Sequence, residues 1–227
     1  MIQAGRADWP CNFFHRNENT PDVTHISFVH RDVSTEDTEI PLVEGAEETE
    51  FGLTVVTSTK NNAPAHRARY LMPSGNMFKL PAKSKDEVEG RDYTFFRVPI
   101  DDEHHTAFSV SVIHPTREGA RKLAALDTDQ RGKPFSVSKL GDAILAGDLH
   151  IRDVMDGTYD PYTVQEVQDY VAMVGQGPMP ARSQDHLGGA DLGISLLRKV
   201  WSRELRALAE GRPLKEWTPG AGLASHF

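Results

Sequence analysis

Cysteine is almost absent from this sequence, since Cys11 is the only one in 227 residues. A disulfide within the chain is therefore impossible. A cage of thiolates, such as those that hold zinc ribbons and iron–sulfur clusters, is excluded for the same reason. Any metal ion that the chain binds must take its ligands from imidazole and carboxylate groups.

A basic surplus and a long apolar run are missing as well. The formal net charge is −8, whereas a surface that binds nucleic acid needs an excess of positive charge. No apolar run approaches the roughly 20 residues that a membrane-spanning helix requires. The first six residues show no charged-then-apolar leader. We therefore expect a cytoplasmic protein that binds neither nucleic acid nor membrane.

Five segments rich in β-branched and aromatic residues predict strands. Turn residues such as Pro73-Ser74-Gly75 separate them, at a spacing typical of an antiparallel sheet. The acidic segment Thr35–Glu50, which has little to bury, is predicted to be a loop. The predicted strands are Phe51–Thr57, His66–Met72, Asn76–Leu80, Tyr93–Pro99 and Ala107–Ile113.

Helices are predicted on both sides of these strands. Thr20-Pro21-Asp22 is a capping-like pattern that can open a short helix, and Arg117–Leu126 and Thr163–Val174 predict two more. A longer C-terminal helix is indicated by an apolar stripe. Strands followed by helices predict an α+β fold with helices packed on one face of the sheet, as one domain over residues 1–227. The stripe consists of Leu197, Val200, Trp201, Leu205 and Leu208.

The segment from Asp22 to His30 carries the main chemical signal. His25 and His30 stand five residues apart, and Asp22 precedes the first of them by three. Five residues advance about 140° beyond a full helical turn, so both rings can meet one metal ion only if the helix ends or widens between them. Taken alone, the pair favours two partly buried polar residues on a helix. The His-Glu-x-x-His pattern of zinc proteases is absent.

Three blocks of sequence resemble one known family. They are Cys11-Asn12-Phe13 with Asp22-x-x-His25-x-x-x-x-His30, then Val98-Pro99-Ile100-Asp101-Asp102-Glu103-His104-His105, then Asp169–Met173 with Gln176–Met179 and Arg182–Gly188. In this order they resemble the catalytic half of Rieske ring-hydroxylating oxygenase α subunits, closest to the phthalate and phenoxybenzoate dioxygenase branch. The blocks span nearly the whole chain, which makes them more specific together than any one alone.

The resemblance implies a helix-grip sheet of the START type around a substrate pocket, with mononuclear ferrous iron at its inner end. His25 and His30 match the family's two iron-binding histidines, and Asp169 matches its third ligand. Two neutral imidazoles and one carboxylate on one face of Fe(II) leave the opposite face open for dioxygen and substrate. Such a site needs no thiolate, so the single cysteine is no obstacle.

Asp22 matches the family's bridging carboxylate, which links an iron-ligand histidine to a cluster-ligand histidine on a neighbouring subunit. A metal-bound imidazole commonly donates its other N–H to such a group, and we assign Asp22 this catalytic role. A helix N-cap is the alternative. Asp169 is chosen by the family match and not by spacing, because other carboxylates stand nearby in the sequence. These are Asp156, Asp160, Glu166, Asp185 and Asp191.

The family's electron-entry domain carries a [2Fe–2S] cluster on two cysteines and two histidines, which this chain cannot build. We therefore expect a C-terminal fragment without the Rieske domain, or a cluster that arrives on a partner chain. The resemblance implies a homotrimer in the full-length protein, with a reductase or ferredoxin as electron donor. The isolated chain should bind iron without turning over.

Other conspicuous residues receive an ordinary interpretation. His104-His105 and Asp101-Asp102 are predicted to be a solvated turn between strands, and Cys11 a small packed residue. The lead-in Asn17-Glu18-Asn19 departs from the family's more acidic, Gly-rich pattern, which bears on substrate more than on iron. Candidate pocket-lining residues are Phe51, Leu53, Phe78, Phe95 and Phe108.

The resulting hypothesis is an oxygenase component that hydroxylates, or oxidatively demethylates or cleaves, a small aromatic substrate with O2. The alternative is a non-catalytic helix-grip module that binds a ligand and has lost its redox partner. Iron content separates the two. The sequence identifies neither the substrate nor the choice between mono- and dioxygenation.

Overall fold

The computed structural model describes residues 1–33, 39–60, 62–80, 86–88, 90–122, 137–159, 161–179 and 182–218. Its strands are β1 (Ile2–Trp9), β2 (Leu42–Glu48), β3 (Gly52–Thr59), β4 (Asn62–Leu71), β5 (Gly75–Leu80), β6 (Arg91–Pro99) and β7 (His105–Val112). Its helices are α1 (Phe13–Asn19), α2 (His25–Val29), α4 (Val137–Ala146), α5 (Ile151–Val154), α6 (Pro161–Val174) and α7 (Leu192–Ala209), with short 3-10 turns at Arg182–Gln184 and Gly189–Asp191.

The strands form one antiparallel sheet in the order β1-β7-β6-β5-β4-β3-β2. Successive strands from β2 to β7 are neighbours, and the N-terminal strand β1 returns to pair with β7 along its whole length, from Ile2 opposite Val112 to Trp9 opposite His105. The predicted α+β class and antiparallel sheet are confirmed.

Two strands were not predicted. Thr35–Glu50 is predicted to be a loop, but Leu42–Glu48 forms strand β2; residues 34–38 lie outside the described part of the chain. β2 is an edge strand paired only with β3, so backbone hydrogen bonds hold it while most of its side chains face solvent. β1 was missed for the same reason, because seven of its eight residues are exposed.

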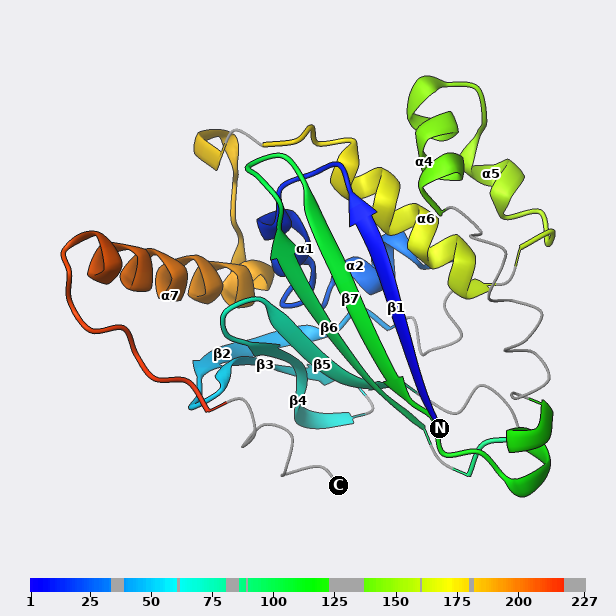
Figure 1. The fold of residues 1–227 in the computed structure, drawn as a ribbon, viewed down its shortest axis with the longest axis horizontal. Helices are drawn as coiled ribbons and strands as arrows, with labels where there is room; N and C mark the ends of the chain where they lie inside the picture. Colours follow the sequence, from blue (N-terminus) through cyan, green and yellow to red (C-terminus); the bar gives the residue numbers. More distant parts are fainter. Residues whose placement is uncertain are drawn as a thin grey trace.

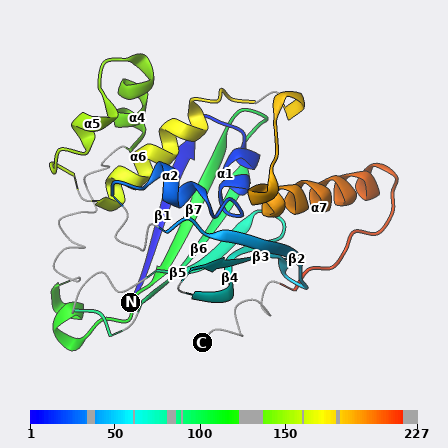
Figure 2. The same ribbon diagram turned by 180° about the vertical axis from the view of Figure 1, so that it is seen from behind.

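Helices cover one face of the sheet in two places. Figures 1 and 2 show α1, α2 and α6 on the same side of β1, β7 and β6, with α7 crossing near β2 and β3. Under α6, Tyr170 and Met173 pack against Trp9 and Ala107. α4 and α5 pack in turn on α6. The predicted helix Thr163–Val174 is confirmed as α6, and residues 117–122 are helical, while the end of predicted Arg117–Leu126 lies outside the described residues.

The C-terminal helix α7 is confirmed, but its predicted stripe is only partly right. Leu197 and Val200 are buried against β3 and β4, whereas Leu205 and Leu208 are 54% and 63% exposed. The buried face continues instead through Glu204 and Ala207. Glu204 occupies a buried position because its carboxylate accepts the N–H of Lys215 and the guanidinium of Arg203. No helix among the described residues is long and apolar enough to cross a bilayer.

Replacing Leu197 by Ala should lower the free energy of unfolding by about 2–5 kcal/mol, because it leaves a cavity between α7 and the sheet. The matched variant Leu208→Ala deletes the same side-chain atoms at an exposed position. It should change the free energy of unfolding by no more than about 0.5 kcal/mol. Chemical denaturation of both variants measures the difference. Equal losses would contradict the packing described for α7.

Candidate metal centre

The histidines of the Asp22–His30 segment meet because helix α2 is very short. It spans only His25–Val29, and His30 follows as its C-cap with φ −103° and ψ 11°. The helix therefore ends between the two rings, which is the condition that their five-residue spacing imposes. The ring centroids lie 5.3 Å apart with their planes at 77°.

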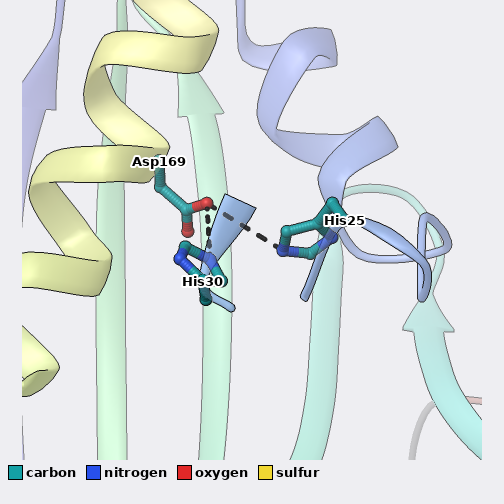
Figure 3. A group of neighbouring side chains, drawn as sticks. All are labelled: His25, His30 and Asp169. Atoms are coloured by element: carbon teal, nitrogen blue, oxygen red, sulfur yellow. Dashed lines mark ion pairs between the residues drawn. The ribbon is translucent and has the colours of Figure 1, made fainter. Parts of the chain in front are cut away.

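Asp169 of α6 brings its carboxylate to the two rings. Its Oδ1 lies 3.1 Å from Nε2 of His30 and 3.9 Å from Nε2 of His25. Figure 3 shows the three side chains directed toward a common space. One candidate ligand atom from each residue lies within 4.8 Å of the other two. The structure thus brings together the three residues that the sequence analysis selected as metal ligands.

Both imidazoles are oriented by hydrogen bonds at Nδ1. The Nδ1–H of His30 donates to Oε1 of Gln168 at 2.9 Å, and that of His25 donates to the backbone carbonyl of Asp22. A carbonyl oxygen can only accept, so Nδ1 carries the proton in each ring. In the neutral form of each ring, the lone pair of Nε2 would therefore point toward Asp169. A cation between these atoms would relieve the repulsion between lone pairs and carboxylate.

The charges at this site act on one another strongly. Burial alone would lower the pKa of the His30 imidazole, but the hydrogen bond and charge of Asp169, together with Gln168, raise it above its usual value. Burial would likewise raise the pKa of the Asp169 carboxyl, yet His30, His25 and Arg16 together lower it. The carboxylate is therefore ionised at neutral pH and attracts a proton or a metal ion to the rings.

Asn19 also belongs to the site and was not predicted as a site residue. Its side-chain amide donates to Oδ1 of Asp169 at 3.3 Å and lies 3.5 Å from Nε2 of His25. It ends α1, six residues before His25. The available signal was the unusual lead-in Asn17-Glu18-Asn19. Gln168 was missed too, although it directly precedes Asp169.

The Asp22 carboxylate makes local contacts. Its Oδ1 accepts the Oγ1–H of Thr24 at 2.8 Å and the backbone N–H of His25 at 3.2 Å. The N-cap of α2 is Thr24, so the alternative role of Asp22 as the N-cap residue is wrong, although its carboxylate lies against the start of the helix. His25 donates to the backbone carbonyl of Asp22 and not to its carboxylate. The bridging role involves a neighbouring subunit and stays a prediction.

Of the other conspicuous residues, the Asp101–His104 turn and Cys11 agree with the prediction, and His105 does not. Asp101 and His104 form a solvated turn in which the Asp101 carboxylate accepts from His104 and Glu103. His105 was expected to be solvated, which is wrong: it opens β7 opposite Trp9 on the covered face and is completely buried. Its Nδ1–H donates to the carbonyl of Cys11, and burial lowers its pKa to about 4. Cys11 is a packed residue, as predicted.

Comparison with known proteins supports the resemblance. No protein-family model matches the chain. The oxygenase subunit of 5,5'-dehydrodivanillate O-demethylase from Sphingobium sp. is 38% identical over 48 residues, which are 21% of this chain and 11% of that protein.

Solved structures extend the match to most of the chain. NdmA of Pseudomonas putida CBB5, in a mutant with caffeine, aligns with 93% of this chain at a TM-score of 0.57 and 16% identity. NdmB of the same strain gives 0.52 and 14% over 93%. The oxygenase of carbazole 1,9a-dioxygenase, in complex with ferredoxin, gives 0.50 and 14% over 87%. The chain spans about half the length of each, between 52% and 54%. The fold is therefore that of a Rieske oxygenase catalytic domain, and the resemblance noted in the sequence is confirmed at the level of this fold.

In metal-free protein, we expect the His30 imidazole to titrate above the ordinary value of 6.5. The raised pKa means that the pairing with Asp169 stabilises the fold while His30 is protonated, and that this stabilisation is lost as the pH rises through the folded-state pKa. Because the pKa of Asp169 is lowered from 3.8, the carboxylate stays ionised throughout this range. In Asp169→Asn, burial dominates and the pKa of His30 should fall. Histidine NMR titration measures both proteins, and an unchanged His30 titration would contradict the pairing.

Proposed function

We propose that this chain, which has the fold of a Rieske oxygenase catalytic domain, is the iron-binding part of an oxygenase in which His25, His30 and Asp169 hold one ferrous ion. The observation that carries the proposal is the convergence of two Nε2 lone pairs and one ionised carboxylate on a common space. The fold match supports it independently, because fold similarity and side-chain geometry are separate observations.

The residues present fit iron. Two imidazoles and one carboxylate are the ligand set of non-haem iron oxygenases, and the set leaves coordination positions open. When bound, the iron would supply the dioxygen chemistry that no side chain of the chain can perform. The single cysteine is buried, and burial raises its pKa to about 11, so it does not compete for metal as a thiolate at neutral pH.

The chain's own residues would hold the ligands in readiness for the ion. Gln168 and the carbonyl of Asp22 fix the tautomer and orientation of the two rings. Asn19 donates to the Asp169 oxygen that faces both rings and so restrains the carboxylate. α1, α2 and α6 supply these groups from the covered face of the sheet, where low solvent access strengthens each interaction.

The names of the similar proteins suggest a substrate class and an electron-transfer partner for this chain, which we propose. The curated relative is an O-demethylase subunit, and one solved relative is an oxygenase in complex with ferredoxin. We propose oxidative attack on an aromatic compound, with electrons delivered from a [2Fe–2S] cluster on another domain or chain. In a trimeric full-length protein, Asp22 would bridge to the cluster of a neighbouring subunit. The iron-loaded chain alone should show no turnover with a reductase.

The test of the proposal is metal binding. The chain, purified without oxygen and supplied with Fe(II), should retain one equivalent of iron after desalting, and His25→Ala should retain almost none. His104→Ala is the matched control, because His104 lies in an exposed turn and its side chain pairs with Asp101, away from the three candidate ligands. Metal analysis decides between the two functional hypotheses. Failure to bind iron specifically would favour the non-catalytic ligand-binding module.

Gln168 gives a second, graded test. Gln168→Leu removes the acceptor for Nδ1 of His30 while preserving side-chain size, so Fe(II) affinity should fall about 10- to 100-fold. Gln176→Leu is its control, because Gln176 is exposed just beyond the same helix and donates to the carbonyl of Ala172. Competition with a chelator measures both affinities. Equal affinity in the two variants would show that Gln168 does not orient the ligand.

A further inference from the structure

A cavity of about 650 Å³ opens at the surface beside the start of α6. Its walls come from the turn after α5, the first residues of α6 and the residues that follow His30. The backbone N–H of Val33 donates to the carbonyl of His30 at 3.0 Å, so one wall begins close to a candidate iron ligand. The apolar part of the lining consists of Val33, Met155, Tyr159, Pro161 and Val164.

The predicted pocket-lining residues do not border this cavity. Leu53 belongs to the core beneath α7, and Phe108 is 41% exposed. Phe78 and Phe95 contact each other on the sheet, with ring centres 5.8 Å apart. The cavity is instead lined by a helix and two connecting segments, whose side chains show no sheet periodicity in the sequence.

Met155 separates this cavity from the interior. It is the C-cap of α5, is partly buried, and packs against the buried valines of α5 and α6 while also lining the cavity. Its Sδ accepts a hydrogen bond from Nε2 of Gln168 at 3.9 Å. A thioether sulfur is only a weak acceptor. Met155 thus connects a space that is open to solvent with a residue of the candidate metal centre.

Gln168 links the position of Met155 to the orientation of His30. Its side-chain amide donates to the sulfur through Nε2 and accepts the Nδ1–H of His30 through Oε1 at 2.9 Å. The two contacts hold opposite atoms of one planar group, and Gln168 is only 9% exposed. A displacement of the amide nitrogen must therefore move the oxygen that orients the His30 ring.

Met155 differs from the other five methionines of the chain. Three of them are buried and so protected from an oxidant in solution, and two are exposed. Among the described residues, neither exposed sulfur forms a hydrogen bond with Gln168 or with a candidate ligand. Met155 therefore combines access with contact to the site. The buried methionines are Met72, Met77 and Met173, and the exposed ones are Met1 and Met179, at 40% and 59%.

We propose that Met155 is an oxidation site, and that conversion of its thioether to the sulfoxide displaces Gln168 and releases the hydrogen bond that orients His30. Hydrogen peroxide is the oxidant. It transfers one oxygen atom to the sulfur and leaves as water, so the sulfur loses two electrons and the protein neither gains nor loses a proton. Methionine sulfoxide reductases reverse this change.

The displacement follows from the space at the sulfur. The added oxygen is polar and competes for the N–H of Gln168. It cannot form a hydrogen bond of ordinary length within the 3.9 Å between sulfur and nitrogen, so the amide has to move. Loss of the orienting partner should then weaken iron binding at His30. Only this last consequence rests on the proposed function, whose co-substrate O2 yields hydrogen peroxide by two-electron reduction.

The first test uses the full chain without metal, treated with hydrogen peroxide under mild conditions. Peptide mass spectrometry should find the sulfoxide at Met155 and at the exposed Met179 well before it appears at the buried Met72 or Met173. The NMR signals of the Gln168 side-chain amide and the His30 ring should shift at constant pH. Oxidation of Met155 no faster than the buried methionines, or unchanged signals after it, would overturn the proposal.

The second test measures Fe(II) affinity without oxygen, by competition with a chelator after catalase has removed the peroxide. Oxidation should lower the affinity of the parent about tenfold, and sulfoxide reductase should restore it. Met155→Leu, which conserves volume, should keep its affinity through the same treatment, while the matched control Met179→Leu should lose it as the parent does. In Gln168→Leu the peroxide should cause no further loss. An equal loss in Met155→Leu would show damage elsewhere and overturn the proposal.

Failure of this inference is distinguishable from failure of the proposed function. If the untreated chain retains no iron, while oxidation of Met155 still shifts the Gln168 and His30 signals, the oxygenase proposal falls and the oxidation site stands. If the chain retains one equivalent of iron, and oxidation of Met155 changes neither the signals nor the affinity, the reverse holds.

Discussion

The structure depends on one electrostatic constraint: the Asp169 carboxylate faces two imidazole rings, and the Nδ1 atom of each ring already forms a hydrogen bond elsewhere. With Nδ1 of His30 bound to Gln168 and Nδ1 of His25 bound to the carbonyl of Asp22, each Nε2 is left to face an ionised oxygen. The Asn19 amide contacts both sides of this arrangement, and a proton or a metal ion between the rings and the carboxylate would satisfy it further. The raised pKa of His30 is the expression of this constraint in the metal-free chain.

The fold delivers the three groups through packing that is unremarkable by itself. Tyr170 and Met173 of α6 pack on Trp9 of β1 and Ala107 of β7. This packing fixes the rotation of α6 so that Asp169 faces the histidines of the α2 segment. α2 ends after five residues, so His30 lies just beyond the helix and its ring can approach the ring of His25. The edge pairing of β1 with β7 completes the surface on which α6 rests. Apolar burial thus fixes a polar geometry that would be unfavourable without its cation.

Much of this could be predicted from the residues. The five inner strands and the helices α6 and α7 carry apolar patterns of the proper period, and the three candidate ligands follow from blocks that resemble a family. Edge strands could not be recognised, because β1 and β2 expose most of their side chains and are held by backbone pairing. His105 and Arg97 were beyond reach as well. The sheet register places His105 opposite Trp9 and Arg97 opposite the buried Ala107, whereas polar residues at such positions look like surface positions in sequence.

The most direct test of the central claim is a crystal of the chain loaded anaerobically with Fe(II), with diffraction recorded at the iron absorption edge. The account predicts a single anomalous peak bonded to Nε2 of His25, Nε2 of His30 and a carboxylate oxygen of Asp169. Iron bound elsewhere, or these three side chains turned away from one another in the loaded crystal, would contradict it.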